Sequence, residues 1–490
     1  MRRKRTDSLI QWKKSPSRKP LILQGLRQTG KTWLLLDFGS KQYENTLYIN
    51  LETDKPAADY LSIPHDPQEA LLFLETYADK PLRPSTSLLI LDNLQCVPQI
   101  STLLAGIALD FPHYHIAAIK KGVYPDPDYT SNDFDILTLY PMDFEEFLWT
   151  NAEFALAREI RAHFSTFTSM EKSLHAKALH QFHLYQITGG IPLSVLEYKK
   201  GKSLLMVPDI QQKILDLYLA DITASAPKGT ATHSRKSWLS IPSQLGKSSR
   251  RFQYTRIAKG ATAKTYQESL NWLIHSGLAL SCPGYAKTEP EALSGLHLYP
   301  VDVGLCTRIL KLPSYQLLSG EENPSCTACA ETFLAQQFTQ NGYNLSYWHS
   351  QNQAEVPFLL EKSGKYIAVD YRLSPHQKCR NLMRFNDSIG KNILSNNSNC
   401  KSNCGENHNI KITAMKPIPP KIITVKKCIS FLPKTSKKKS TIGSYRFTQH
   451  SAFKLNPSAL HIKRVAVPSG LYPQSNCHSF GLIPHLSNIS

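Results

Sequence analysis

The stretch of sequence that decides the expected fold is Gly25-Leu26-Arg27-Gln28-Thr29-Gly30-Lys31-Thr32. It fits the pattern G-x-x-x-x-G-K-[ST], whose two glycines let the backbone wrap closely around an anion. An apolar run over residues 20–24 predicts a strand before this P-loop, and residues 33–38 predict a helix after it. A glycine turn beside a solvated lysine would have the same letters, but the two flanking elements favour a phosphate-binding loop.

Each position of the P-loop has a chemical role in this prediction. Backbone N–H groups would point at phosphate oxygens, and the positive end of the following helix would face the same anion. Lys31 would supply a cation for the β- and γ-phosphates, and Thr32 a hydroxyl for Mg²⁺. We therefore predict that ATP and Mg²⁺ bind to Gly25, Arg27, Gln28, Thr29, Gly30, Lys31 and Thr32.

Short apolar runs elsewhere in the first third of the chain predict a sheet around this loop. The expected strands cover residues 19–24, 45–51, 87–91, 113–118 and 136–140. Amphipathic stretches separate them, and strands that alternate with helices predict a parallel sheet covered on both faces. The expected fold class is α/β, with a P-loop NTPase core over residues 1–150.

A P-loop needs a second strand that ends in an acid. Residues 87–91 supply the strand, and Asp92 at its end is predicted to support Mg²⁺. Asn93 follows, where many ATPases carry a glutamate that polarises the attacking water. An amide can orient water but cannot accept its proton, so we expect intact nucleotide binding and slow or lost hydrolysis. Asp92 and Asn93 are the candidate catalytic residues.

The net charge of +19 is concentrated at one end of the chain. Residues 374–490 hold 18 Lys or Arg and two acids, a net of +16, whereas residues 1–373 are nearly neutral at +3. This low-complexity tail has three interpretations, which stay open: a disordered basic arm that binds nucleic acid, a solvated tail without a partner, and a frameshift product.

Composition excludes several classes of protein. Hydrophobic residues make up 41% of the 490 residues and charged residues 19%, a balance that fits a globular protein and not collagen, a coiled coil or a wholly disordered chain. The longest apolar runs are too short to cross a bilayer, and no apolar stretch follows the basic residues 1–5. Ten scattered cysteines fit a reducing compartment. We expect a cytoplasmic protein with no membrane partner.

Several short motifs follow the P-loop in a fixed order. They are Tyr48-Ile49-Asn50-Leu51-Glu52, residues 88–95, 137–148, Thr188-Gly189-Gly190-Ile191-Pro192, residues 241–245 and 299–305, Glu331, Tyr347-Trp348 and residues 354–358. With the Arg27-Gln28 pair, this set resembles bacterial and archaeal AAA-type ATPases that carry a region called domain of unknown function 4143. The resemblance covers roughly residues 1–373. It implies an ATPase core, a winged-helix-like segment and a C-terminal domain similar to the PD-(D/E)xK nuclease fold.

The chain departs from that family at positions that matter for chemistry. Family members usually have Asp-Glu at the positions of Asp92-Asn93. They also have a Ser that can sense the γ-phosphate in the stretch that corresponds to residues 119–122 of this chain. In the nuclease-like region Glu331 is kept, but Pro357 replaces a metal-binding Asp and Arg372 replaces a Lys. Because proline has no ligand atom in its side chain and arginine does not lose its proton, nuclease activity is not expected.

Four further segments follow the core. Residues 151–230 lack strand patterns and predict a helical, lid-like region, and residues 231–310 suit a winged-helix-like segment. Basic residues of that segment and of the tail could contact DNA, although a small helical domain with a solvated basic face fits equally well. Residues 311–373 predict a truncated nuclease-like α+β region, in which residues 326–373 contain one helix and three strand-like runs. Residues 374–490 form the basic tail.

The leading hypothesis from the sequence is an ATP-binding AAA-type protein. It would be a weak ATPase that couples its nucleotide state to the winged-helix-like and nuclease-like C-terminal region. The alternatives are a non-hydrolysing nucleotide-binding interaction protein or degenerate remnant, and a DNA-binding regulator. A protein partner and an oligomer both remain open.

Overall fold

The computed structural model describes residues 1–123, 127–166, 168–247, 249–285, 295–350, 354–362, 365–371, 381–382, 384–385, 410–418 and 422–428. All of these residues belong to the first of the two units of the chain, Met1–Ile429. Among their helices, none combines the length and the apolar character that crossing a membrane requires.

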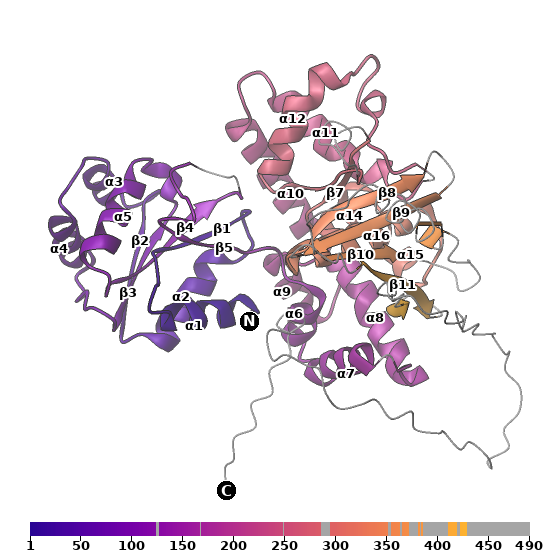
Figure 1. Cartoon of the computed structure of the whole chain (residues 1–490), viewed down its shortest axis with the longest axis horizontal. Helices are drawn as coiled ribbons and strands as arrows, with labels where there is room; N and C mark the ends of the chain where they lie inside the picture. Colours follow the sequence, from indigo (N-terminus) through magenta and orange to yellow (C-terminus); the bar gives the residue numbers. More distant parts are fainter. Residues whose placement is uncertain are drawn as a thin grey trace, which may run out of the picture. The chain divides into compact units, whose positions relative to one another are not determined.

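A five-stranded sheet forms the core of the N-terminal part (Figure 1). Its strands are β1 (Leu21–Gly25), β2 (Asn45–Asn50), β3 (Ser87–Asp92), β4 (His115–Lys121) and β5 (Asp135–Thr138). They lie in the order β2-β3-β4-β1-β5, and every pairing is parallel. The predicted α/β fold class is confirmed, and each predicted strand lies within three residues of the observed one.

The apolar side chains of the sheet alternate between its two faces. On β3, Leu89 and Leu91 belong to one buried cluster and Leu88 and Ile90 to another. The first cluster includes helices α3 (Lys55–Leu61), α4 (Pro67–Ala78) and α5 (Ile100–Asp110), and the second includes α1 (Arg5–Lys14) and α2 (Lys31–Gln42). Since successive side chains of a strand point to opposite faces, a strand covered on both sides has to be apolar throughout, as residues 88–91 are.

The order of the strands places the P-loop. After β1 the chain runs to β2 at one edge of the sheet, and after β4 it passes β1 to reach β5 at the other edge. Where neighbouring parallel strands lead in opposite directions, a crevice opens at their carboxyl ends. The P-loop begins at the end of β1 and therefore lies at this crevice.

Helices dominate the middle of the chain, as predicted for residues 151–230. They are α6 (Phe144–Thr150), α7 (Phe154–Thr166), α8 (Lys172–Thr188), α9 (Pro192–Gly201), α10 (Val207–Ser225), α11 (Ala231–Gln244) and α12 (Ala263–His275). An antiparallel ribbon of β6 (Ala279–Cys282) and β7 (His297–Pro300) follows, and then α14 (Val303–Ile309) and α15 (Ser314–Leu318). Two single 3₁₀ turns, η1 (Leu94–Cys96) and η2 (Tyr254–Arg256), complete the connections.

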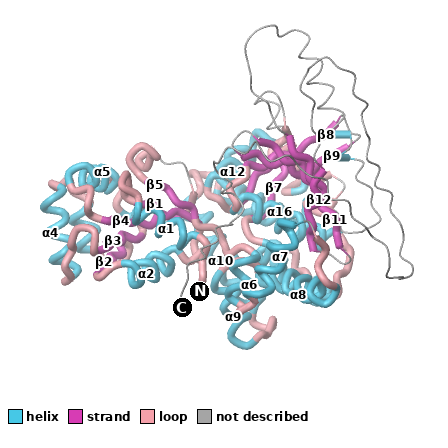
Figure 2. The backbone as a smooth tube through the Cα atoms, turned by 60° about the horizontal axis from the view of Figure 1, so that its bottom comes forward, coloured by secondary structure: helices cyan, strands magenta, loops and turns pink. Residues whose placement is uncertain are grey.

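A second sheet follows α16 (Pro324–Gln340). The predicted three strands are β8 (Asn344–Ser350), β9 (Ala354–Lys362) and β10 (Lys365–Asp370). Two more strands, β11 (Ile410–Ile418) and β12 (Ile422–Cys428), extend the sheet in the order β12-β11-β10-β9-β8 (Figure 2). They fall inside the segment predicted as a low-complexity tail, most of which lies outside the described residues. The alternation of apolar and polar letters over residues 410–413 is the strand signal at that point.

A capping box begins α6. The Asp143 carboxylate accepts a hydrogen bond from the Glu146 backbone N–H at 2.8 Å, and the Glu146 carboxylate accepts one from the Asp143 N–H at 3.1 Å. The buried guanidinium of Arg3 lies 3.2 Å from the Glu146 carboxylate. The acids of this motif therefore anchor the N-terminus of the chain to α6.

The glycine turn before α9 is held by a buried acid. The backbone N–H of Gly190 donates to Asp302 at 2.6 Å, and a Cβ on Gly190 would lie 2.0 Å from the carbonyl oxygen of Met142. Burial raises the pKa of Asp302 to about 6, although the backbone hydrogen bonds that it accepts lower it. This packing gives residues 189–192 a structural role.

Candidate functional site

Glycines and a buried threonine shape the P-loop. Gly25 has a φ of +153° and Gly30 a φ of +88°, and a Cβ on Gly25 would lie 2.3 Å from the carbonyl oxygen of Leu139. The Thr29 hydroxyl donates to a carbonyl within the loop at 2.9 Å, and the Arg3 guanidinium donates to the Thr29 carbonyl at 2.8 Å. Larger side chains would therefore change the path of the backbone at both glycines.

The ammonium of Lys31 is buried against the inside of the loop. It donates hydrogen bonds to the carbonyl oxygens of Gly25 at 2.9 Å and Leu26 at 2.8 Å. The pKa of Lys31 is lowered to about 8, chiefly by burial; the attraction of Asp92 opposes this shift, and the nearby cation of Lys121 adds to it. A bound phosphate would offer this ammonium a negatively charged hydrogen-bond acceptor in place of the two neutral carbonyl groups.

Asp92 and Thr32, the two residues predicted to hold Mg²⁺, contact each other across the crevice. The Thr32 hydroxyl donates to Asp92 Oδ2 at 2.6 Å, and the Tyr48 hydroxyl donates to the same oxygen at 3.1 Å. Asp92 Oδ1 accepts the backbone N–H of Asn93 at 2.8 Å. Hydroxyl and carboxylate oxygens are ligands that Mg²⁺ takes, so the residues present fit this ion.

Asn93 ties the end of β3 to the end of β2. Its Nδ2 donates to Asn50 Oδ1 at 2.8 Å, and its Oδ1 accepts a hydrogen bond from Gln95 Nε2 at 3.0 Å. Asn50 Oδ1 also accepts the backbone N–H of Glu52 at 3.0 Å. Both polar atoms of the Asn93 amide are therefore engaged with neighbouring residues, and the contact with Asn50 fixes the chain that leads to Glu52.

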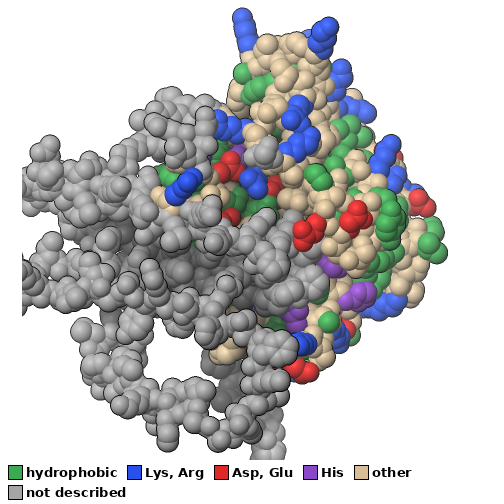
Figure 3. Space-filling view, turned by 90° about the vertical axis from the view of Figure 1, so that its right-hand side faces the viewer, with side chains coloured by type: hydrophobic (Ala, Val, Ile, Leu, Met, Phe, Trp, Pro, Cys, Tyr) green, Lys and Arg blue, Asp and Glu red, His purple; other side chains and the backbone are tan. Residues whose placement is uncertain are grey.

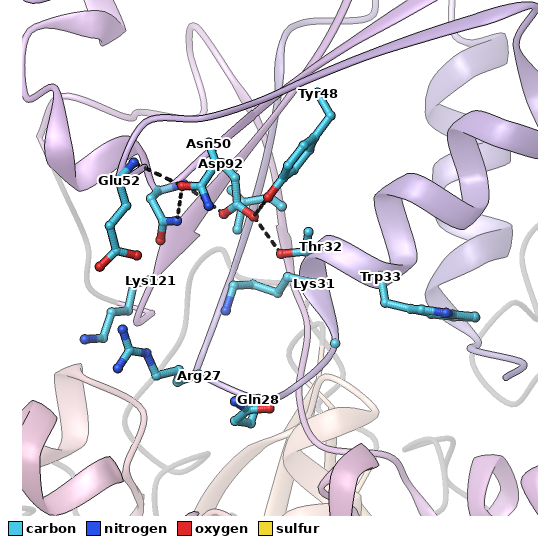
Figure 4. Close-up of a pocket in the computed structure, with 13 residues that line it drawn as sticks. Arg27, Gln28, Lys31, Thr32, Trp33, Tyr48, Asn50, Glu52, Asp92 and Lys121 are labelled. Atoms are coloured by element: carbon cyan, nitrogen blue, oxygen red, sulfur yellow. Dashed lines mark hydrogen bonds between the residues drawn. The ribbon is translucent and has the colours of Figure 1, made fainter. Parts of the chain in front are cut away.

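These residues surround a pocket of about 370 Å³ (Figure 4). Most of the predicted site lines it, namely Arg27, Gln28, Gly30, Lys31, Thr32, Asp92 and Asn93. Gly25 and Thr29 are not among the lining residues, and they act through the backbone of the loop. The pocket also includes residues to which the sequence assigned no role in binding: Trp33, Tyr48, Asn50, Glu52 and Ile119.

Two cations at the pocket share a carboxylate from helix α10. Lys121, at the end of β4, lies 2.6 Å from Asp221 of α10, and Arg27 of the P-loop lies 3.4 Å from the same carboxylate. The Tyr218 hydroxyl of α10 donates to the Arg27 carbonyl at 2.7 Å. Lys121 therefore lines the pocket as part of an ion pair and not as a solvated surface lysine.

Comparison with known families agrees with this geometry. Residues 17–148 match the model of an AAA domain, and the chain thus contains an AAA-type P-loop ATPase-like domain. Residues 179–316 match a different model, the domain of unknown function DUF8612. That match differs from the domain of unknown function 4143 that the sequence resemblance named.

Comparison with single proteins adds remote similarities. No curated protein matches the chain. The Walker-type ATPase PABY2304 of Pyrococcus abyssi is 13% identical over 63% of this chain and 95% of its own, with a TM-score of 0.38. The RuvB Holliday junction branch migration motor of Thermotoga maritima is 14% identical over 64% of this chain and 96% of its own, with a TM-score of 0.27. PCH-2 of C. elegans is 9% identical over 39% and 57%, with a TM-score of 0.25.

A second cluster of charges lies around the fully buried Glu331. Arg250 Nε lies 2.6 Å from the fully buried Glu331, and Arg250 Nη1 lies 2.8 Å from Glu355. The hydroxyl of Tyr371 also donates to Glu331. A guanidinium from the chain itself therefore neutralises the carboxylates that metal-dependent nuclease chemistry would require.

The ion pairs of Arg250 with Glu331 and Glu355 remove this residue from the basic patch predicted for the winged-helix-like segment. Arg250 belongs to that patch in sequence, but its charge is paired inside the protein. The space-filling view shows other Lys and Arg side chains gathered toward the top, over α11 and α12 (Figure 3). The surface open to an anionic partner is therefore smaller than the sequence suggests.

The pKa of Lys31 makes a testable prediction about nucleotide binding. Above pH about 8 the free protein loses the Lys31 proton and has to recover it when a phosphate binds, so the affinity for ATP should fall as pH rises. Between pH 8 and 10 the fall should approach about tenfold per pH unit, with matching proton uptake in calorimetry. A Lys31→Arg variant keeps its charge and should lose this slope. Equal wild-type affinity at pH 7 and pH 9.5 would contradict the assignment.

The Arg250 cluster makes a prediction about stability. Arg250→Ala leaves Glu331 buried without its cation and should lower the free energy of unfolding by about 3–5 kcal/mol. Arg256→Ala is the matched control, because the Arg256 guanidinium donates to Gln253 in an exposed contact and its loss should cost at most about 0.5 kcal/mol. Urea unfolding of both variants tests this, and equal midpoints would show that the cluster is not stabilising.

Proposed function

We propose that the protein binds MgATP at the P-loop and hydrolyses it slowly. The bound nucleotide would control the conformation of the helical and C-terminal regions. The observation that carries this proposal is the convergence of Lys31, Thr32 and Asp92 on one pocket at the crevice of the sheet. Lys31 would bind the β- and γ-phosphates, and Arg27 and Lys121 would add positive charge on the other side of the pocket.

Mg²⁺ would be held by Thr32 and Asp92, whose oxygens already meet at 2.6 Å. When bound, the ion neutralises charge that develops on the phosphate oxygens. Tyr48 donates to the same Asp92 oxygen at 3.1 Å and keeps that carboxylate in place. The loop, its lysine and this pair together give the parts that phosphoryl transfer needs for positioning and charge stabilisation.

Coupling to the rest of the protein would run through α10. Asp221 of this helix pairs with both Lys121 and Arg27, the two cations that also face the pocket. A triphosphate would compete with the Asp221 carboxylate for these cations and weaken the attachment of α10 to the nucleotide site. Helix α10 would then have two states, one with Asp221 paired to Arg27 and Lys121 and one with these pairs broken, and a bound nucleotide would favour the second.

A non-hydrolysing nucleotide-binding protein is the second candidate. One observation favours it: Asn93 stands where a carboxylate is expected, and both of its polar atoms are engaged by Asn50 and Gln95. Nucleotide binding without turnover would distinguish this candidate from the ATPase.

The test of the proposed function is MgATP binding and steady-state hydrolysis by the full chain beside Lys31→Ala. Loss of the ammonium should weaken MgATP binding by at least about tenfold and abolish any turnover, because a charged hydrogen bond to phosphate contributes about 1.5–3 kcal/mol. Calorimetry measures the first effect and phosphate release the second. Unchanged binding by Lys31→Ala would refute the site, and binding without turnover would favour the second candidate.

The α10 contact makes its own prediction. Asp221→Asn should raise the affinity for MgATP by about three- to tenfold, because it removes a negative charge that competes with the phosphates for Lys121 and Arg27. Asp216→Asn, on the same helix but exposed, is the matched control and should leave the affinity unchanged. If Asp221→Asn binds MgATP like the wild type, the competition that would couple α10 to the nucleotide does not occur.

A further inference from the structure

We infer that Glu52 is the general base for ATP hydrolysis and replaces the carboxylate that Asn93 lacks, an inference that rests on the proposed function. Two carboxylates, Asp92 and Glu52, are among the described residues that line the pocket. No catalytic role was expected for Glu52 from the sequence, because this residue follows the second strand and not the strand of Asp92.

Asp92 is already committed to other contacts. One of its oxygens accepts hydrogen bonds from the hydroxyls of Thr32 and Tyr48, and the other accepts the Asn93 backbone N–H. A carboxylate with three hydrogen-bond donors, one of them the Thr32 hydroxyl, is suited to hold the site together. It is poorly suited to accept a proton from water.

Glu52 has the opposite character. Its side chain is exposed and lines the pocket. Among the described residues, its carboxylate has no hydrogen-bond donor and no ion-pair partner. Figure 4 shows the carboxylate pointing to the side of the pocket where Lys121 and Arg27 lie. A water between this carboxylate and a phosphate held by these cations would meet the geometric requirement for general base catalysis.

Asn50 holds the backbone at Glu52 and also contacts Asn93, which stands in the usual catalytic position. Asn50 Oδ1 accepts both the Glu52 backbone N–H at 3.0 Å and the Asn93 Nδ2 at 2.8 Å. The Leu51 N–H donates to the Asp92 carbonyl at 3.0 Å, which adds a second link between the ends of β2 and β3. Asn93 thus acts as a positioning residue for Glu52.

The chemical step balances with ATP and water as the reactants. As the water oxygen forms its bond to the γ-phosphorus, one water proton passes to the Glu52 carboxylate. The bond between the γ-phosphorus and the β,γ-bridging oxygen breaks, and ADP leaves with the electron pair. Glu52 then returns the proton to solvent when phosphate is released.

The test compares Glu52→Gln with the wild-type full chain in single-turnover hydrolysis and in MgATP binding by calorimetry. The substitution keeps size and polarity but removes the base, so the rate should fall at least about 100-fold while the Kd for MgATP changes less than about threefold. Glu52→Asp should give an intermediate rate. Glu69→Gln, an exposed acid in the first turn of α4, is the matched control and should hydrolyse ATP at the wild-type rate.

The outcomes separate this inference from the proposed function. Wild-type turnover that is unchanged in Glu52→Gln would overturn the role of Glu52 and leave the ATPase intact. A wild type that binds MgATP without turnover would also overturn it, since no base would then be operating. A wild type that does not bind MgATP would instead refute the proposed function itself.

Discussion

The buried ammonium of Lys31 is the feature on which the site depends. It lies inside a loop whose two carbonyls at 2.8 and 2.9 Å are its hydrogen-bond acceptors, with Asp92 as the nearest source of opposite charge. Burying a cation is costly unless it is hydrogen-bonded and compensated, so the loop has to curve tightly around it. The glycines at positions 25 and 30 permit that curvature. The elements around the loop support this tight curve. The loop begins at the end of β1, α2 begins where it ends, and the Arg3 guanidinium donates to the Thr29 carbonyl within it.

The same constraint connects the pocket to the rest of the chain. The loop that encloses Lys31 also presents Arg27, and Arg27 and Lys121 both lie against Asp221 of α10. The nucleotide phosphates and Asp221 of α10 would thus compete for the same two cations. Nucleotide binding would therefore change the contacts of the helical region directly. In contrast, the Arg250 cluster is satisfied internally by Glu331 and Glu355. Under the proposed function, the cations at the pocket would respond to nucleotide, whereas the Arg250 cluster would contribute to stability.

The sequence predicted the parts of the fold that depend on local pattern. Apolar runs located all five strands of the first sheet, and the P-loop letters located Lys31 and Thr32 beside Asp92. It did not assign a role to Glu52 or Asp221, because their function depends on which strand ends and helices meet in space. Glu52 belongs to one of the short motifs that carry the family resemblance, but neither that motif nor the position of Asp221 within a helix indicates what the side chain faces. The parallel order of β2 and β3 brings Glu52 to the pocket, and packing of α10 brings Asp221 to Lys121.

The most direct measurement of the central claim is a crystal structure of the full chain with Mg²⁺ and a non-hydrolysable ATP analogue. The triphosphate should lie in the P-loop, with the Lys31 ammonium moved from the Gly25 and Leu26 carbonyls to the β- and γ-phosphates. Thr32 and Asp92 should lie at the metal ion. A nucleotide bound elsewhere, with Lys31 still hydrogen-bonded to both carbonyls, would contradict it.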